Sequence, residues 1–186
     1  MSDVAVLGAG SWGTALAMQL LRSGTGAVLW GRNPGHVAAM EAAGCNQRFL
    51  PDNPFPPGLL LQSSLEQAVR QADEVLVSVP SHAFVGIIAK IQAWLKPGQG
   101  VAWACKGLEP GSGHFLHQAA QGILGDERPL AVVTGPSFAT EVAANLPTAV
   151  TVAGTEPAFC GQIARLLHGG NFRAYTSDDI VGAELG

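Results

Sequence analysis

Short apolar runs alternate with stretches of helical spacing along almost the whole chain. The apolar runs that we interpret as strands are Val4–Leu7, Ala27–Trp30, Val75–Val79, Val101–Cys105, Leu130–Thr134 and Ala149–Val152. The stretches that we interpret as helices are Thr14–Ser23, Ser81–Leu95, Ser112–Leu124 and Glu156–Leu167. Runs without polar alternation are typical of strands buried on both faces of a parallel sheet. The pattern therefore predicts a doubly wound α/β fold with a mostly parallel sheet.

One segment, Asn46–Gly58, interrupts this alternation. It contains Pro51, Pro54, Pro56 and Pro57. Because proline fixes φ and has no N–H to donate, we expect no helix and little strand pairing there. The strand and helix pattern resumes afterwards, so we expect an ordered excursion on the surface.

Composition excludes several classes of protein. Of the 186 residues, 47% are hydrophobic and 13% are charged, and the net charge is −4. No run of Lys or Arg supplies the basic footprint that nucleic-acid binding requires. No apolar stretch approaches the roughly 20 residues of a membrane span, and the chain does not begin with a signal-peptide pattern. The three cysteines lie far apart, which indicates free thiols and a cytoplasmic protein.

The first predicted strand runs directly into the turn Gly8-Ala9-Gly10-Ser11-Trp12-Gly13. A helical pattern follows, and Gly24 is placed as its C-terminal stop. In this context Gly8 permits a tight turn, Gly10 lets the backbone approach a pyrophosphate, and Gly13 lets the helix pack close to the strand. The helix N-terminus then holds the anion. We predict a dinucleotide site in a Rossmann-type fold.

The second predicted strand ends in Gly31-Arg32-Asn33. NAD-specific folds usually place an acid here to bind the ribose 2′-hydroxyl. A guanidinium instead favours a 2′-phosphate, so Arg32 predicts NADPH as the preferred cofactor, with NADH as a possible second one. The alternative is that Arg32 is a solvated surface arginine.

Two further segments follow predicted strands at the edge where open α/β sheets bind ligands. Lys106 is suited to attract a phosphate or polarise a carbonyl, unless it is only a surface lysine. Gly135-Pro136-Ser137 opens a helical stretch, in which Ser137 is the expected N-cap. The free N–H groups of that helix start could equally serve an anionic substrate.

Three other motifs are less specific. Pro80 ends a strand, with Ser81 as the expected helix cap, and we interpret this segment as a wall of the cofactor cleft. Phe49 either stacks near the cofactor or packs under the proline-rich segment. His114 and His117 share a helix face, but no further ligands complete a metal site, and we expect both to face solvent.

Several stretches together resemble one family, the N-terminal domain of bacterial-type NAD(P)+-dependent glycerol-3-phosphate dehydrogenase. They are Gly8–Ala17, Leu29–Arg32, Asn46–Pro51, Val79–His82, Lys106–Glu109, Gly135–Ala139, Leu146–Ala149 and Asp179–Gly186. The resemblance implies reduction of dihydroxyacetone phosphate to sn-glycerol 3-phosphate for phospholipid synthesis, by a homodimer when full length.

The resemblance also implies roles for individual residues. Residues matching Ser11, Trp12, Arg32 and Ala139 contact the cofactor in that family. The residue matching Lys106 contacts both cofactor and substrate. Those matching Gly135 and Ser137 bind the substrate.

The family's proton-donor lysine lies beyond the segment that matches Glu184–Gly186. We therefore expect residues 1–176 to form the NAD(P)-binding domain and 177–186 to begin a helical substrate domain that this chain lacks. Ser177 is the expected cap of its first helix. Such a chain would bind NADPH without reducing the substrate. The alternatives are another NADPH dehydrogenase, such as a ketopantoate or 3-hydroxyacid reductase, and a non-catalytic NADPH sensor.

Overall fold

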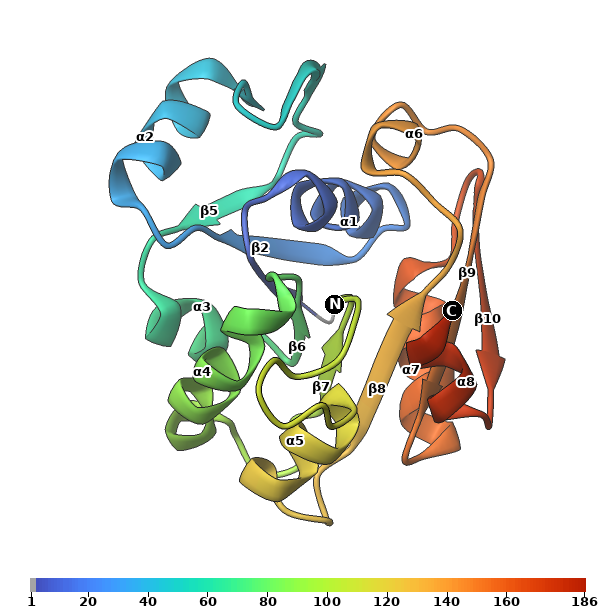
Figure 1. The fold of residues 1–186 in the computed structure, drawn as a ribbon. Coiled ribbons are helices and arrows are strands. Elements are labelled where there is room, and N and C mark those ends of the chain that lie inside the picture. The colour runs from blue at the N-terminus through green and yellow to red at the C-terminus, as the bar shows by residue number, and fades with distance from the viewer. Residues whose placement is uncertain (1–2) are drawn as a thin grey trace.

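A computed structural model describes residues 3–186 and contains an eight-stranded sheet (Figure 1). The strands are β1 (Asp3–Leu7), β2 (Gly26–Trp30), β5 (Leu60–Gln62), β6 (Glu74–Val77), β7 (Val101–Trp103), β8 (Leu130–Thr134), β9 (Thr148–Gly154) and β10 (Phe172–Ser177). Their order is β10-β9-β8-β7-β6-β1-β2-β5. Every neighbouring pair is parallel except β8 and β9. The predicted doubly wound, mostly parallel sheet is confirmed.

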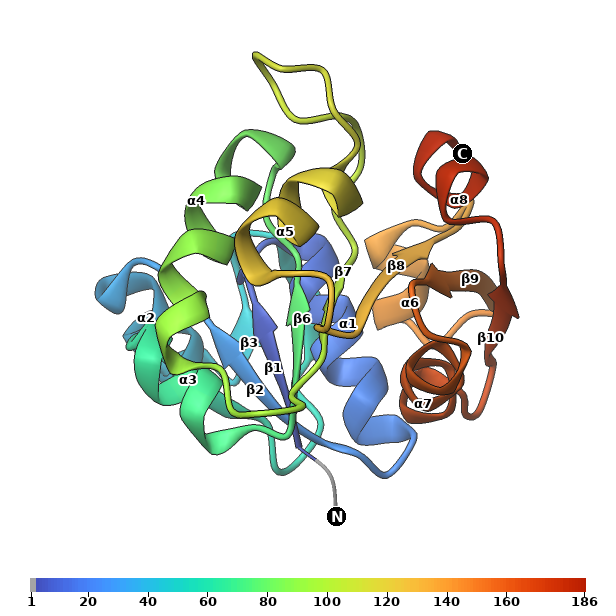
Figure 2. The same ribbon diagram turned by 90° about the horizontal axis from the view of Figure 1, so that it is seen from below.

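Helices cover both faces of this sheet (Figure 2). They are α1 (Ser11–Arg22), α2 (Pro34–Ala43), α3 (Leu65–Gln71), α4 (Ser81–Ile91), α5 (Leu116–Leu124), α6 (Ala139–Ala143), α7 (Pro157–Leu167) and α8 (Ile180–Leu185). The apolar side chains of α1, α2, α6 and α7 share one buried cluster. Those of α3, α4 and α5 share the other, and α8 packs Ile180 and Ala183 against it.

Strand β1 shows why the sequence runs are continuously apolar. Val4 and Val6 point into the cluster beneath α1, whereas Ala5 and Leu7 point into the opposite cluster. All four side chains are at most 1% exposed. A strand with helices on both faces has no polar face, so the period-two alternation disappears.

The direction of chain progress reverses between β1 and β6. From β1 the chain moves through β2 to β5 at one edge, and from β6 it moves through β7 to β8 in the opposite direction. The connections after β1 and β6 therefore diverge, and open α/β sheets bind ligands in the crevice that results. This position is where the candidate site lies.

The proline-rich segment is more regular than expected. β3 (Cys45–Asn46) pairs antiparallel with β4 (Leu50–Pro54), with an irregularity in register between Cys45 and Asn46. The expectation of little strand pairing there was wrong. In a two-stranded ribbon each strand has an unpaired edge, where a proline removes no ladder hydrogen bond.

The helix starts also differ from expectation. Ser81, Ser137 and Ser177 are not N-caps, because α4, α6 and α8 are capped by Pro80, Phe138 and Asp179. The Asp179 carboxylate accepts a 2.8 Å hydrogen bond from the Gly182 N–H. α5 begins at Leu116, four residues after the predicted start at Ser112. A serine near a helical pattern locates its start only to within a few residues.

The end of α1 is as predicted. Its C-cap is Ser23, and Gly24 follows with a φ of +85°. The Gly24 N–H donates to the Leu21 carbonyl. No helix among residues 3–186 combines the length and apolar character needed to cross a bilayer.

A buried amide joins α1 to the connection between α7 and β10. Gln19 is 1% exposed, and its Nε2 donates to the carbonyls of Leu167 at 2.9 Å and Gly169 at 3.3 Å. Gln19→Met keeps the side-chain shape but leaves both carbonyls without this donor. We expect the free energy of unfolding to fall by about 1–3 kcal/mol, measured by urea denaturation.

The matched control is Gln71→Met at the exposed end of α3. A change there should stay within about 0.5 kcal/mol, as is usual for surface positions. Equal losses for the two variants would contradict the role assigned to Gln19.

Candidate functional site

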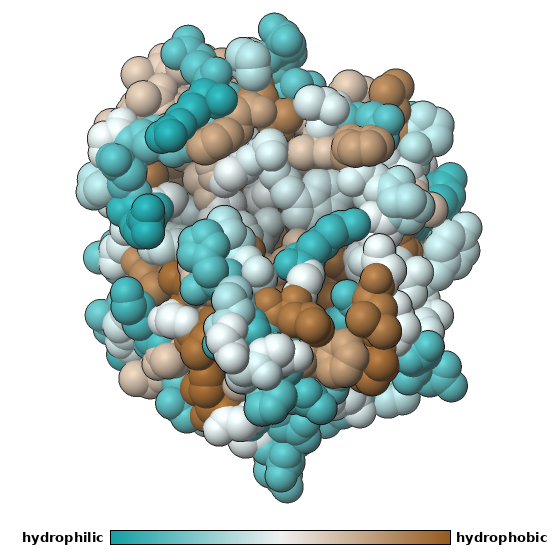
Figure 3. All heavy atoms as spheres, in the orientation of Figure 1, coloured by the Kyte–Doolittle hydropathy of each residue, from teal (hydrophilic) through white to brown (hydrophobic). Residues whose placement is uncertain are grey.

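A cavity of about 570 Å³ opens where β1, β6, β7 and β8 end. In the orientation of Figure 1, this face of the molecule is hollowed at its centre (Figure 3). Its volume lies within the range of small-molecule and cofactor sites, about 300–1,000 Å³. The lining includes these residues singled out from the sequence: Gly10, Ser11, Trp12, Gly13, Pro80, Lys106, Gly135, Ser137 and Ala139.

The glycine turn needs two of its glycines for close packing. Gly8 has a φ of +132°, and a Cβ there would lie 2.1 Å from the Ser78 carbonyl oxygen. A Cβ on Gly13 would lie 1.9 Å from the Gly8 carbonyl oxygen. Both positions therefore exclude any side chain, and Gly8 itself lies beneath the cavity, outside its lining.

Gly10 differs, because a Cβ there would meet nothing within 4 Å. It is the N-cap of α1 and lines the cavity. The N–H groups of the first helical turn have no acceptors within the helix. An anion at Gly10 would therefore meet unpaired donors and the positive end of the helix dipole.

Asn46 holds this turn in place. The residue is fully buried, and its Nδ2 donates to the Ala9 carbonyl at 3.1 Å and to Thr14 Oγ1 at 2.8 Å. Its Oδ1 lies 3.1 Å from Nε2 of His36, in the first turn of α2. No local pattern in the sequence marks Asn46, because its partners on the turn lie more than 30 residues away.

Lys106 follows β7 and lies at the cavity. Its Nζ is 3.4 Å from the Gly135 carbonyl oxygen, at the end of β8. Among the cavity residues, all within the described part of the chain, Lys106 alone carries a charge. The neighbouring Cys105 is inert at neutral pH, because burial raises the pKa of its thiol to about 12.

Ser137 lies between the end of β8 and the start of α6. Its N–H donates to the Gly135 carbonyl at 2.9 Å. Its Oγ is buried and has no hydrogen-bond partner within residues 3–186. A buried hydroxyl without a partner is costly and uncommon, and Ser137 is one of the residues that line the cavity. Next to it, Phe138 lines the cavity with 70% of its surface exposed.

Arg32 and Phe49 lie outside the cavity lining. Arg32 is exposed just after β2. Phe49 is 40% exposed, with the Arg48 guanidinium 5.1 Å from its ring centre and the His36 ring edge-on at 5.7 Å. Phe49 therefore packs against the first turn of α2, which begins just after Arg32.

The expectation that His114 and His117 share a helix face and both face solvent was wrong in part, because α5 begins only at Leu116. His114 is exposed, but the His117 side chain is only 13% exposed and its Nδ1 lies 2.6 Å from Glu184 Oε2. The contact forms because α8 packs beside the start of α5. In residues 3–186 no group of three or more His, Cys, Asp or Glu side chains is arranged as a metal site.

Other cavity residues had no sequence signal of their own. They lie at or just beyond the carboxyl ends of β6, β7 and β8 and are small or apolar: Ser78, Ala104, Cys105, Val133, Thr134 and Phe138. The rule that ligands bind beyond the carboxyl ends of parallel strands could have found them once strand order was known.

Comparison with known proteins identifies the family of this chain. Residues 3–160 match the model of the NAD-dependent glycerol-3-phosphate dehydrogenase N-terminus. The chain belongs to this family. The family match favours the glycerol-3-phosphate dehydrogenase interpretation of the sequence over the other dehydrogenases considered.

Relatives cover the chain from end to end. Glycerol-3-phosphate dehydrogenase [NAD(P)+] of Aeromonas hydrophila is 50% identical over 98% of the chain and 55% of its own length. The protein of the same name in Xanthomonas campestris is 55% identical over the whole chain and 56% of its own length. The chain thus spans about half the length of these glycerol-3-phosphate dehydrogenases.

Solved structures agree with the fold of the family. The crystal structure of glycerol-3-phosphate dehydrogenase from Coxiella burnetii aligns with a TM-score of 0.93 and 43% identity, over 98% of this chain and 56% of that one. A ketopantoate reductase from Ralstonia eutropha aligns with a TM-score of 0.72 at 20% identity. The second likeness shows the Rossmann-like fold alone.

The glycine geometry of this family member predicts a contrast between two substitutions. Gly13→Ala forces α1 away from the Gly8 carbonyl and should lower the free energy of unfolding by about 1–3 kcal/mol or more. Gly10→Ala meets open space and should cost less than about 1 kcal/mol, the usual loss at an N-cap.

Urea denaturation of both variants, compared with the unaltered chain, measures the contrast. A larger loss for Gly10→Ala than for Gly13→Ala would show that the close packing of α1 does not depend on Gly13.

Proposed function

We propose that this chain is the NAD(P)-binding domain of a glycerol-3-phosphate dehydrogenase that reduces dihydroxyacetone phosphate to sn-glycerol 3-phosphate for phospholipid synthesis. The names of its relatives, glycerol-3-phosphate dehydrogenase [NAD(P)+], support this activity. Because the chain spans about half their length, the complete reaction is proposed for the longer protein. The chain alone binds cofactor without turnover.

One observation carries the proposal: a glycine turn and a lone lysine face the same cavity. The turn lies beyond β1 and Lys106 lies beyond β7. Cofactor pyrophosphate and substrate phosphate are both anions, and each needs positive charge or unpaired N–H donors. The lining residues include no carboxylate that would repel them.

The residues present fit a dinucleotide. Open space above Gly10 lets a pyrophosphate approach the backbone, and the first turn of α1, with Ser11 and Trp12, supplies donors and an apolar surface. Pro80 and Ala139 would form the walls, and Phe49 would lie near the adenosine. The bound cofactor supplies hydride transfer.

Arg32 would decide which cofactor is preferred. It is exposed after β2, where the ribose 2′-position of a dinucleotide lies in this fold. A guanidinium there forms charge-assisted hydrogen bonds to a 2′-phosphate. We therefore propose NADPH as the preferred cofactor and NADH as a weaker one.

Lys106 would contact both the cofactor and the substrate, and Gly135 and Ser137 would hold the substrate. The Lys106 ammonium attracts the substrate phosphate, and the buried Ser137 hydroxyl gains the partner that it lacks. The proton donor would be a lysine beyond Gly186, in a helical domain that begins with residues 177–186. The longer protein would be a cytoplasmic homodimer.

Titration of NADPH and NADH into the chain, followed by the fluorescence of Trp12 at the cavity, tests the proposal. We expect both to bind, NADPH more tightly. Arg32→Ala should weaken NADPH binding by about 10- to 100-fold, the loss of one or two charged hydrogen bonds, and leave NADH nearly unchanged.

Two variants serve as comparisons. Gly10→Ala should weaken both cofactors equally, because the pyrophosphate is common to them. Arg70→Ala, at an exposed ion pair on α3, should change neither. Equal losses of NADPH and NADH in Arg32→Ala would remove the basis for NADPH preference, and absence of binding to the unaltered chain would overturn the proposed function.

A further inference from the structure

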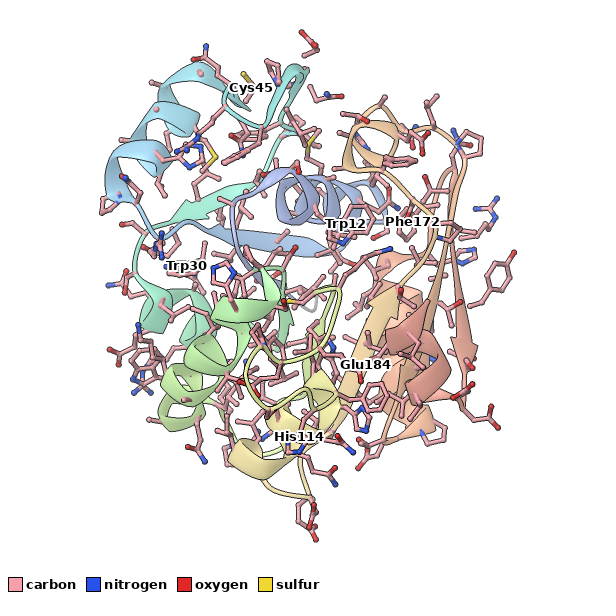
Figure 4. All side chains as sticks on the ribbon, in the orientation of Figure 1. Trp12, Trp30, Cys45, His114, Phe172 and Glu184 are labelled. Carbon is pink, nitrogen blue, oxygen red and sulfur yellow. The ribbon has the colours of Figure 1, made fainter. Side chains whose placement is uncertain are left out.

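The carboxylate of Glu184, on α8, is a buried acceptor for three donors. Its side chain is 3% exposed. Oε1 accepts hydrogen bonds from Trp103 Nε1 at 3.2 Å and from the His117 backbone N–H at 3.0 Å. Oε2 lies 2.6 Å from His117 Nδ1. Figure 4 shows Glu184 where α8 faces α5.

These donors lie at the two ends of one connection. Trp103 is the last residue of β7, and His117 is the second residue of α5. The segment between them, residues 104–115, is described in full and contains neither helix nor strand. It carries Lys106, so one carboxylate holds both ends of the segment that presents this lysine to the cavity.

The same helix also packs against β8, beside the strand end that Lys106 contacts. Gly182 and Ala183 of α8 share a second hollow with Thr134 and Gly135. The Gly135 carbonyl oxygen is the atom that lies 3.4 Å from Lys106 Nζ. α8 therefore contacts both the anchor points of the lysine segment and the strand end on which the lysine rests.

We propose that Glu184 is a positioning residue: by holding both ends of segment 104–115, its carboxylate sets the place of the Lys106 ammonium in the cavity. This inference rests on the proposed function, because it assigns Lys106 to the bound cofactor. Glu184 is outside the cavity lining and acts only through the segment that it holds.

A second buried carboxylate, that of Glu74, provides a control that distinguishes positioning of Lys106 from general stabilisation of the fold. Glu74, 7% exposed at the start of β6, accepts from the Gly100 N–H at 2.9 Å and from Gln162 Nε2 at 2.8 Å. It lies at the opposite end of the strands from the cavity. Glu74→Ala should reduce stability but leave the affinity for NADPH unchanged.

The test is a double-mutant cycle on NADPH affinity in the full 186-residue chain, followed by tryptophan fluorescence, to which Trp12 at the cavity contributes. We expect Glu184→Ala and Lys106→Met each to weaken binding by about tenfold, and the double variant to be no weaker than Lys106→Met. Glu184→Gln should restore nearly normal affinity, since its oxygen serves the same two N–H donors and its amide can donate to His117 Nδ1.

If Glu184→Ala fails to fold, Trp103→Phe replaces it, because it keeps an aromatic ring beside Phe84 and removes one donor to Glu184. We expect Trp103→Phe to weaken NADPH binding less than Glu184→Ala does. In the Lys106→Met background, Trp103→Phe should cause no further loss. Hydrogen exchange provides a readout that needs no ligand. The backbone amides of residues 104–115 should exchange faster in Glu184→Ala and in Trp103→Phe than in the unaltered chain, whereas the amides of β1 should exchange at an unchanged rate.

Three results would overturn the inference. They are unchanged NADPH affinity in Glu184→Ala, equal losses with and without Lys106, and unchanged affinity in Lys106→Met. If the unaltered chain binds no NADPH, the proposed function fails first, and faster exchange confined to 104–115 would then show only that Glu184 holds the segment.

Discussion

The close contact between the start of α1 and the ends of β1 and β6 determines where everything else in the site can lie. Backbone meets backbone there, since Gly13 packs on the Gly8 carbonyl and Gly8 on the Ser78 carbonyl. Hydrogen bonds continue past the strands, from Gly8 N–H to the Trp30 carbonyl and from Ser78 N–H to the Leu7 carbonyl. The N-terminus of α1 is thereby placed directly over the crevice where the strand order reverses.

This crevice contains little charge, so each source of positive potential has a large effect on an anionic ligand. The lining is apolar or neutral apart from Lys106, and the helix start of α1 adds unpaired N–H groups at some distance from that lysine. Two centres of positive potential in one cavity suit a ligand pair with two separate anionic groups. The proposed ligands, a dinucleotide and a phosphorylated substrate, would together provide such groups.

The sequence predicted the central strands well, because burial on both faces leaves a continuous apolar run. It did not reveal β10, whose FRAYTS alternates in exposure at the sheet edge, or β5, which has only three residues. The glycine turn, Lys106 and Ser137 were found because local spacing carries their signal. The serine caps were misplaced, since α4 and α6 begin after Pro80 and Phe138 without any side-chain cap, and a serine nearby does not fix the boundary.

Buried polar side chains were beyond the reach of sequence patterns. Asn46 and Glu184 are buried side chains, and apart from His36 their hydrogen-bond partners lie 32 to 81 residues away in the chain. Nothing in local spacing distinguishes such a residue from a polar group on the surface. Only strand order and helix packing bring donor and acceptor together.

Asn46 and Glu184 also supply hydrogen bonds at places where the sheet supplies none. Ladder hydrogen bonds fix the strands, but the connections that form the cavity continue beyond the ladder and must satisfy their own backbone groups. Asn46 pairs the Ala9 carbonyl of the glycine turn, and Glu184 pairs the His117 backbone N–H at one end of the lysine segment and the Trp103 indole N–H at the other. An apolar residue of similar volume could fill either place in the core. It would leave the partner donors or acceptors unpaired and the adjoining connection without an anchor, so the geometry of the cavity depends on polar contacts that the packing of the core does not require.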